Sequence, residues 1–329
     1  MPLKKVSEYI RRNKRFLITT HTSPEGDALG SQLAFYMLLK KMGKFALMVN
    51  EDIVPDEYNF LPGANKIQRM RKSLAKFKFD CFVTLDCSDL KRCGKVSIFS
   101  INKPVVNIDH HISNARFADV NCVDAKASSA AEIVYRLYKQ LRIPLNKDIA
   151  TCLYVGILTD SGSFHYSNTT SLTHKIASHL LTFGLDSAQI YKKIYQSMPF
   201  RDIQLLTRIL SNLKVQFNAK VAWLALEKSL LKNTKISIDL TEQILSFARN
   251  IKDLEVVVLF KENLKTKNEI RVNFRSQGKI DVNKIAGFFG GGGHKTASGA
   301  TVKGSLGQVS KKVLAKIKES LCARKLYTA

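Results

Sequence analysis

Acidic and histidine side chains form four short clusters in the first half of the chain. They lie within HTSPEGD at residues 21–27, LDCSD at 85–89, DHH at 109–111 and GILTDSGSF at 156–164. Converging carboxylates repel one another and lose hydration when buried, and proteins usually offset that cost with a cation. Carboxylates with neutral imidazoles suit divalent ions such as Mn²⁺ or Mg²⁺. The clusters provide enough ligands for two ions, which together can activate water and clamp both oxygens of a phosphoryl transfer.

Each cluster also has an ordinary structural interpretation. One aspartate after a strand is usually a turn residue or a helix N-cap, and that alternative applies to Asp27 or Asp89 taken singly. One histidine is usually structural or on the surface, and we expect one of these roles for His165, His174 and His179. Four such clusters at the ends of predicted elements in one domain instead indicate a metal centre.

The elements that must position these residues alternate between two patterns. Short apolar, strand-like runs occupy residues 15–20, 45–50, 81–85 and 105–108, and segments with helical spacing occupy 28–42, 128–141 and 149–159. This alternation predicts an α/β fold with a mostly parallel sheet. Ligands of such sheets bind beyond the carboxyl ends of the strands. Three of the four clusters directly follow a predicted strand, as this rule requires.

The second half has a different organisation. Residues 171–213 are predicted as consecutive helices, followed by strands at 214–217, 221–226, 255–260 and 270–274 and helices at 241–250 and 307–323. We therefore predict a metal-binding catalytic domain over 1–190, a helical linker over 191–213 and a smaller α/β domain over 214–329.

The net charge of the 329 residues is +25, from 52 Lys and Arg against 27 Asp and Glu. Residues 1–200 contribute +11 and residues 201–329 contribute +14, so the shorter second part is the better candidate for holding an anion. No apolar run reaches the ~18 residues of a membrane span, and no secretory signal is visible. The six cysteines form no CxxC pair, and we interpret them as reduced and the protein as cytoplasmic.

The second domain contains a candidate phosphate-binding set. Arg271 and Arg275 lie in IRVNFRS with strand spacing, which places both guanidinium groups on one face for phosphate recognition. A run of glycines at 290–293 lets backbone N–H groups approach an anion, although taken alone it is equally consistent with a hinge. The candidate substrate-binding residues are Arg271, Arg275, Gly291, Gly292, Gly293, His294 and Ser298.

These motifs together resemble the DHH/DHHA1 family of phosphoesterases. HTSPEGDALGS is similar to the first family motif, LDCSD to the second, DHH to the third and GILTDSGSF to the fourth, and GGGGHKTASGA is similar to the glycine-rich signature of the DHHA1 domain. The motifs occur in the family's order and cover nearly the whole chain. Within the family, the chain most resembles the bacterial bifunctional oligoribonucleases (nano-RNases) that are also pAp phosphatases.

The resemblance implies a role for each site residue. One metal ion would be held by His21, Glu25 and Asp86, and a second by Asp27, Asp86, His110 and Asp160, with Asp86 bridging. Asp109 would orient the neighbouring imidazoles, and His111 would contact the scissile phosphate or assist proton transfer. The ions would be Mn²⁺, with Mg²⁺ as the alternative. The family usually has aspartate at the position of Glu25, whose carboxylate extends one methylene further.

The activity implied is hydrolysis of very short oligoribonucleotides to mononucleotides and removal of the 3′-phosphate from adenosine 3′,5′-bisphosphate (pAp). Substrates would be short RNA and nucleotides, without a membrane partner, and a homodimer is an expectation at the level of the family. Two alternatives remain: a phosphodiesterase acting on cyclic or linear dinucleotides, and a non-catalytic protein that binds nucleotides or nucleic acid. Carboxylates in a pure binding groove would repel phosphates, which disfavours the last alternative.

Overall fold

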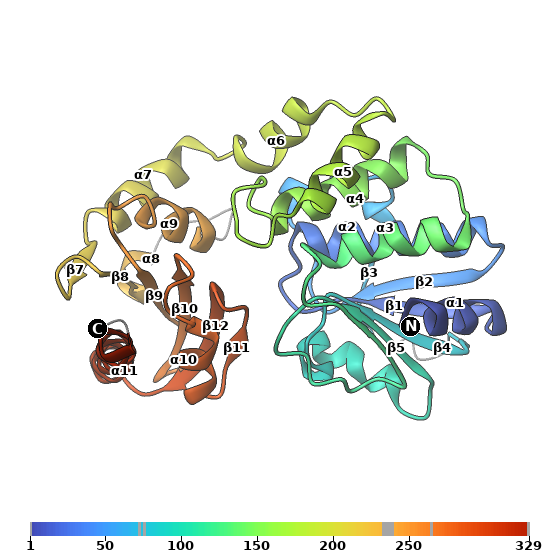
Figure 1. Ribbon diagram of the computed structural model, residues 1–329. Helices are drawn as coiled ribbons and strands as arrows, with labels where there is room; N and C mark the ends of the chain where they lie inside the picture. The colour runs from blue at the N-terminus through green and yellow to red at the C-terminus, as the bar shows by residue number, and fades with distance from the viewer. Residues whose placement is uncertain (1, 72–73, 75–76, 232–239, 264–265, 328–329) are drawn as a thin grey trace. The chain divides into compact units, whose positions relative to one another are not determined.

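The computed structural model describes residues 2–71, 74, 77–231, 240–263 and 266–327. It divides into two compact units, Met1–Ser197 and Met198–Ala329. Figure 1 shows an α/β architecture in each of them, which confirms the predicted fold class. Among the described residues, no helix is both long and apolar enough to span a bilayer.

The first unit is built on a six-stranded sheet in the order β3-β2-β1-β4-β5-β6, in which every strand pair is parallel. The strands are β1 (Arg15–Thr19), β2 (Phe45–Asn50), β3 (Gln68–Arg69), β4 (Cys81–Leu85), β5 (Val105–Asp109) and β6 (Val120–Val123). The helices are α1 (Pro2–Arg12), α2 (Gly26–Lys41), α3 (Ala130–Leu141), α4 (Lys147–Asp160), α5 (Ser171–Leu181) and α6 (Ser187–Tyr195), with 3-10 segments η1 (Asp56–Tyr58), η2 (Ala64–Lys66) and η4 (Leu90–Ser100).

The central strands of this sheet are buried on both faces, as their continuous apolar runs predict. Phe16 and Ile18 of β1 join the core formed with α1, α2, α3 and α4, whereas Leu17 packs on the opposite face with Val96 of η4. The helices α2, α3 and α4 lie together over one face of the sheet (Figure 1). This rigid layered core positions the loops at the carboxyl ends of β1, β4 and β5.

The second unit contains a mixed sheet in the order β11-β12-β10-β9-β8-β7, in which only the β8–β9 pair is parallel. Its strands are β7 (Lys214–Gln216), β8 (Val221–Leu226), β9 (Val256–Glu262), β10 (Glu269–Ser276), β11 (Gly292–Gly293) and β12 (Ala297–Lys303). Its helices are α7 (Phe200–Leu210), α8 (Lys228–Leu231), α9 (Thr241–Ala248), α10 (Val282–Phe288) and α11 (Leu306–Tyr327). One face of the sheet packs against α10 and α11 and the other against α7 and α9.

Candidate active site

The predicted metal ligands come from elements that end at the same edge of the first sheet. His21 follows β1, Asp86 follows β4 and His110 follows β5, while Asp27 lies in the first turn of α2 and Asp160 ends α4. The two helices pack closely because glycines face the neighbouring backbone. A Cβ at Gly30 would lie 2.3 Å from the carbonyl oxygen of Cys152, and one at Gly156 would lie 2.9 Å from Asp27 Oδ1.

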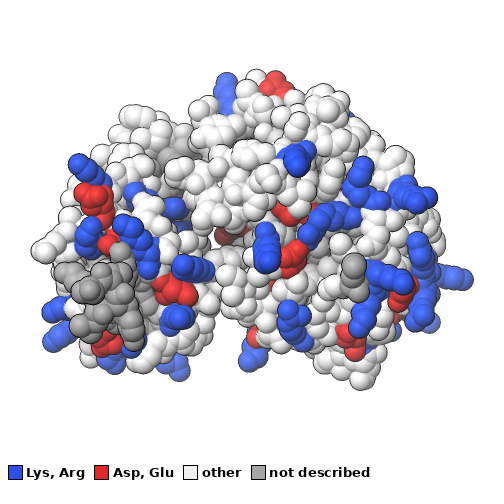
Figure 2. All heavy atoms as spheres, in the orientation of Figure 1, with Lys and Arg blue, Asp and Glu red and all other residues white. Residues whose placement is uncertain are grey.

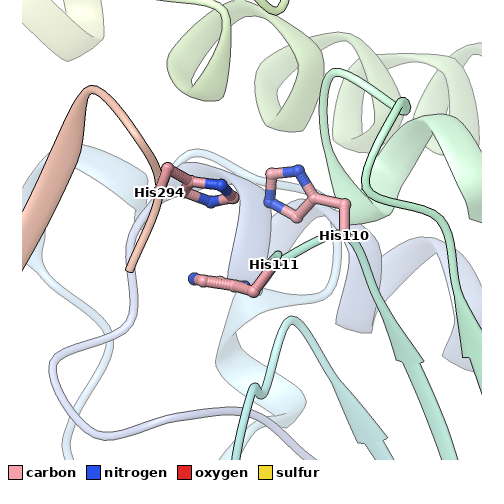
Figure 3. A group of neighbouring side chains, drawn as sticks. All are labelled: His110, His111 and His294. Atoms are coloured by element: carbon pink, nitrogen blue, oxygen red, sulfur yellow. The ribbon is translucent and has the colours of Figure 1, made fainter. Parts of the chain in front are cut away.

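His110 is the centre of the acidic cluster. Its Nε2 atom lies 3.4 Å from Asp86 Oδ1, 3.4 Å from Asp160 Oδ2 and 3.7 Å from Asp27 Oδ2. Its Nδ1 atom lies 3.4 Å from the carbonyl oxygen of Ala127, an arrangement that directs Nε2 toward the carboxylates. Burial lowers the pKa of His110, but the surrounding carboxylates outweigh burial and raise it well above its usual value. Figure 3 shows the His110 and His111 rings side by side at the end of β5.

Asp86 is buried and lies between two histidines of the cluster. Its φ angle is +55°, a left-handed conformation that aspartate adopts more readily than most residues other than glycine. Its Oδ2 atom lies 3.4 Å from His21 Nε2, while Oδ1 accepts no hydrogen bond from the described residues. Burial raises the pKa of Asp86, but the His110 and His21 imidazoles outweigh burial and hold it well below its usual value.

Asp27 is held by the start of another helix. Its two oxygens accept the backbone N–H groups of Ala130 at 2.6 Å and Ala131 at 2.9 Å, in the first turn of α3. Burial raises the pKa of Asp27 well above its usual value, and the Asp86 charge adds to that effect. Asp27 therefore accepts hydrogen bonds from free backbone N–H groups at the start of α3, which is the kind of structural role considered above. The same carboxylate also faces His110. The carboxylate retains lone pairs for a cation.

The donor set fits a divalent cation. Ligand atoms of Asp27, His110 and Asp160 lie within 4.8 Å of one another, and so do those of Asp86, Asp109 and His111. The Asp86 Oδ1 atom, buried without a hydrogen bond, is the kind of acceptor that a cation would satisfy. Glu25 belongs to neither group. It precedes α2 with an exposed side chain, and its charge contributes to raising the pKa of Tyr58, a shift caused mainly by burial.

His111 is oriented by three neighbours. Its Nδ1 atom donates to Asp109 Oδ1 at 2.8 Å, and Asn114 Nδ2 donates to Asp109 Oδ2 at 2.6 Å. Arg92 Nη1 lies 3.3 Å from the other ring nitrogen of His111, Nε2. Burial raises the pKa of Asp109, but the His111 ring outweighs burial and holds it below its usual value. Both oxygens of Asp109 are thus engaged, one with His111 and the other with Asn114.

Sequence reasoning missed Arg92 and Asn114. Arg92 lies in η4, where its carbonyl oxygen accepts the N–H of Thr22 at 2.7 Å and so connects η4 to the loop after β1. The available signal was the arginine three residues after LDCSD, in a chain rich in basic residues. Asp89 has the ordinary role considered for it, because it caps η4 by accepting the N–H of Lys91 at 2.8 Å.

The second unit presents its two arginines on one face of β10. Arg271 and Arg275 alternate with the buried Val272 and Phe274, which matches the predicted spacing. Between them, Asn273 pairs with Gly299 of β12, which in turn pairs with Gly292 of β11. The absence of a side chain at Gly299 leaves room for the Arg271 guanidinium, because a Cβ there would lie 2.9 Å from Arg271 Nη2. Two guanidinium groups on one face, with glycines beside them, suit the phosphate of a nucleotide.

The glycine run forms a tight hairpin as well as an exposed loop. Gly293 has a φ angle of +142°, and a Cβ there would lie 2.5 Å from the carbonyl oxygen of Ala297. A Cβ at Gly291 would lie 2.1 Å from the carbonyl oxygen of Gly299, so β11 approaches β12 more closely than a side chain permits. Ser298 Oγ donates to the carbonyl oxygen of His294 at 2.7 Å, which fixes the turn between the two strands.

Comparisons with known proteins agree with this architecture. The model of the DHH family N-terminal domain matches residues 15–157, and that of the DHHA1 domain matches residues 218–321. The chain is 32% identical over 305 residues to the bifunctional oligoribonuclease and PAP phosphatase NrnA of Thermus thermophilus, covering 92% of this chain and 89% of that protein. The protein therefore belongs to the DHH family, as the motifs predicted.

Two further relatives support that assignment. The Bacillus subtilis protein of the same name is 27% identical over 289 residues, covering 87% of this chain and 88% of that protein. The crystal structure of an exopolyphosphatase-related protein from Bacteroides fragilis superposes with a TM-score of 0.84 at 27% identity. That match covers 99% of this chain and 97% of the other. Both matches therefore extend over most of this chain and of the relative.

Proposed function

We propose that this protein is a metal-dependent phosphoesterase that hydrolyses very short oligoribonucleotides to mononucleotides and removes the 3′-phosphate of pAp. The observation that carries the proposal is that three buried or half-buried carboxylates lie within 3.7 Å of His110 Nε2. One of the three oxygens, Asp86 Oδ1, is buried and accepts no hydrogen bond from the described residues. The names of the Thermus thermophilus and Bacillus subtilis relatives support the two substrates. The free cysteines support a cytoplasmic location, and the homodimer remains a prediction.

Two divalent ions, Mn²⁺ or alternatively Mg²⁺, would supply Lewis-acid activation of water and of the phosphoryl oxygens. The residues proposed to hold them are His21, Glu25, Asp27, Asp86, His110 and Asp160, with Asp86 shared. A divalent charge there would lower the pKa of the buried carboxylates that hold it and so offset the effect of burial.

The residues around His111 handle the substrate phosphate. Asp109 accepts the proton on Nδ1, so the neutral ring presents the lone pair of Nε2 toward Arg92. We assign His111 to contact with the scissile phosphate or to proton transfer. Arg92 supplies a fixed positive charge beside it, which stabilises negative charge on the phosphate. In the second unit, we assign Arg271, Arg275, His294 and the glycine hairpin to the terminal nucleotide.

A matched pair of variants tests the metal centre. Asp86 and Asp89 lie in the same LDCSD motif, and only Asp86 faces the histidines, while Asp89 caps η4. Asp86→Asn is expected to abolish Mn²⁺-dependent hydrolysis of pAp, whereas Asp89→Asn is expected to retain it. Isothermal titration of Mn²⁺ should show lost binding in the first variant alone. Near-normal turnover by Asp86→Asn would refute the shared-ligand assignment.

A substrate panel tests the specificity. It contains pAp, RNA of about two to five nucleotides, longer RNA, and cyclic and linear dinucleotides. We expect the highest turnover on pAp and the shortest RNAs. Equal activity on long RNA would contradict the preference for short substrates, and exclusive activity on dinucleotides would favour the phosphodiesterase alternative. Nucleotide binding without any hydrolysis would favour a non-catalytic protein.

A further inference from the structure

The opposite edge of the first sheet carries a row of aromatic rings and cations. Phe45 begins β2, Arg15 begins β1, Phe77 and Phe79 precede β4, and Lys103 precedes β5, so the strand order β2-β1-β4-β5 aligns them along one edge. Arg15 Cζ lies 5.6 Å from the ring centroid of Phe45 and 5.4 Å from that of Phe77. The Phe77 and Phe79 rings stack at 6.2 Å, and Lys103 Nζ lies 5.1 Å from the Phe79 centroid. Phe79 is buried and Phe77 is half-buried against the core, so Phe45 is the ring of this row that is open to solvent.

Phe45 is the open end of this row. Its side chain is 63% exposed, and Lys40 Nζ lies 5.8 Å from its ring centroid in addition to Arg15. A cation over the face of an aromatic ring is attracted by the electrons of the ring, and this cation–π interaction stabilises the exposed phenylalanine. Although two cations lie over its ring, most of Phe45 is exposed to solvent.

Hydrogen bonds bring further cations to the same edge. Lys44 Nζ donates to the carbonyl oxygens of Arg11 and Asn13 at 3.0 and 2.8 Å, and the N–H of Phe45 donates to the carbonyl oxygen of Lys14 at 2.9 Å. These bonds join the ends of α1 and α2 to the starts of β1 and β2. The last turns of the two helices contribute basic residues as well, namely Arg11, Arg12, Lys40 and Lys41.

Acidic groups compensate only part of this charge. Asp80 Oδ2 accepts the backbone N–H groups of Lys14 and Arg15, both at 2.9 Å, and the N–H of Lys14 is the largest cause of its lowered pKa. Figure 2 shows Lys and Arg atoms gathered at the right-hand end of the first unit, with few acidic atoms among them. Helix dipoles explain cations at the ends of α1 and α2, but they do not explain a row of rings between cations.

We propose that this edge, defined by Arg15, Lys40, Phe45, Phe77 and Lys103, is a binding surface for single-stranded nucleic acid. Such a strand presents phosphates for the cations and planar bases for the ring faces, the combination found where proteins hold single strands without sequence preference. An anionic lipid surface would also match the charge and the exposed ring, and the vesicle measurement below tests it; the alternation of rings and cations along the row favours a strand of bases and phosphates. The surface lies at the amino ends of parallel strands whose carboxyl ends carry Asp86 and His110, so it is separate from the metal cluster.

A double variant and a matched control test this proposal. Phe45→Ala/Arg15→Gln removes one exposed ring and one guanidinium from the edge. Phe200→Ala/Arg208→Gln makes the same chemical changes on α7, where Phe200 is 73% exposed and Arg208 is exposed. Fluorescence anisotropy of a labelled single-stranded RNA of about 20 nucleotides, in EDTA to prevent hydrolysis, measures the affinity of each full-length protein across a salt series.

The edge variant is expected to bind about tenfold more weakly, with a salt slope smaller by about 1, while the control matches the wild type. Equal affinities of all three proteins would overturn the proposal. So would an unchanged RNA affinity together with weaker binding of the edge variant to phosphatidylserine vesicles. Phe45→Leu, which preserves apolar packing and removes the planar ring, should also weaken RNA binding; retention of full affinity by this variant would likewise count against stacking.

Hydrolysis of pAp separates this proposal from the proposed function. Phe45→Ala/Arg15→Gln should retain wild-type Mn²⁺-dependent turnover of pAp, because its substitutions lie at the far end of the strands from the metal cluster. If the wild type binds RNA through this edge but hydrolyses nothing, the surface stands and the proposed function fails. If the wild type hydrolyses pAp and the edge variant binds RNA as tightly as the wild type, the proposed function stands and the binding surface fails.

Discussion

Replacing Gly156 with alanine tests whether the close approach of α2 and α4 positions Asp27 in the metal cluster. A Cβ at residue 156 would lie 2.6 Å from Ala131 Cβ and 2.9 Å from Asp27 Oδ1. Ordinary contact begins near 3.4 Å, so these neighbours would have to move by about 0.8 and 0.5 Å. The two atoms belong to one hydrogen-bonded unit, because Asp27 Oδ1 accepts the N–H of Ala131. The added methyl group therefore displaces the start of α3 and the carboxylate together.

The magnitudes separate the effect on stability from the effect on activity. Overpacking a core costs ~1–3 kcal/mol, and alanine in a helix regains ~1 kcal/mol relative to glycine. The net loss of ~0–2 kcal/mol lowers the melting temperature by only a few degrees in a unit of this size. Misplacing a reacting group by about 1 Å costs ~10²-fold in rate. Gly156→Ala should thus fold and lose at least tenfold in Mn²⁺-dependent pAp hydrolysis.

A second glycine provides the control for helix propensity. Gly287 lies in α10, and a Cβ there would meet no atom within 4 Å. Gly287→Ala should therefore retain wild-type turnover and melt at the same or a slightly higher temperature. Calorimetry and a phosphate-release assay measure both variants. Wild-type activity in Gly156→Ala would refute the argument that this packing positions Asp27.

Three further predictions concern other residues. Arg92→Ala should lower kcat by ~10–10²-fold, because it removes positive charge beside His111. Arg92→Lys should recover part of that loss, and the control Lys91→Ala should leave kcat unchanged. Steady-state kinetics on pAp distinguish these outcomes. Arg275→Ala should raise KM about tenfold with little change in kcat, and a pure loss of kcat would contradict its assignment to substrate binding. In the native protein only the exposed Cys322 should react with Ellman's reagent, because the other five thiols are buried. Burial raises the pKa of Cys81, for example, to about 12. Rapid reaction of more than one thiol would refute this expectation.

The sequence by itself determined the chemistry and most of the fold. Strands of the first sheet can be predicted from their continuous apolar runs, and both Phe45–Asn50 and Cys81–Leu85 are bounded as predicted, although only Cys81–Leu85 is buried along its whole length. The motifs identified the family because residue types and spacing are local properties. Short elements without periodicity, such as β11 and α10, could not be predicted, since tertiary pairing and packing stabilise them.

The tertiary structure decided which residues meet and what else they do. Only the packing of α2 against α4 and α3 shows that Asp27 satisfies the start of α3 while it faces His110. Arg92 reaches His111 because η4 folds back over the loop after β1, a contact between residues far apart in sequence that no local pattern encodes. The row of rings along the opposite edge likewise exists only once the strands are ordered β2-β1-β4-β5, because the order of strands in a sheet is a property of the whole fold.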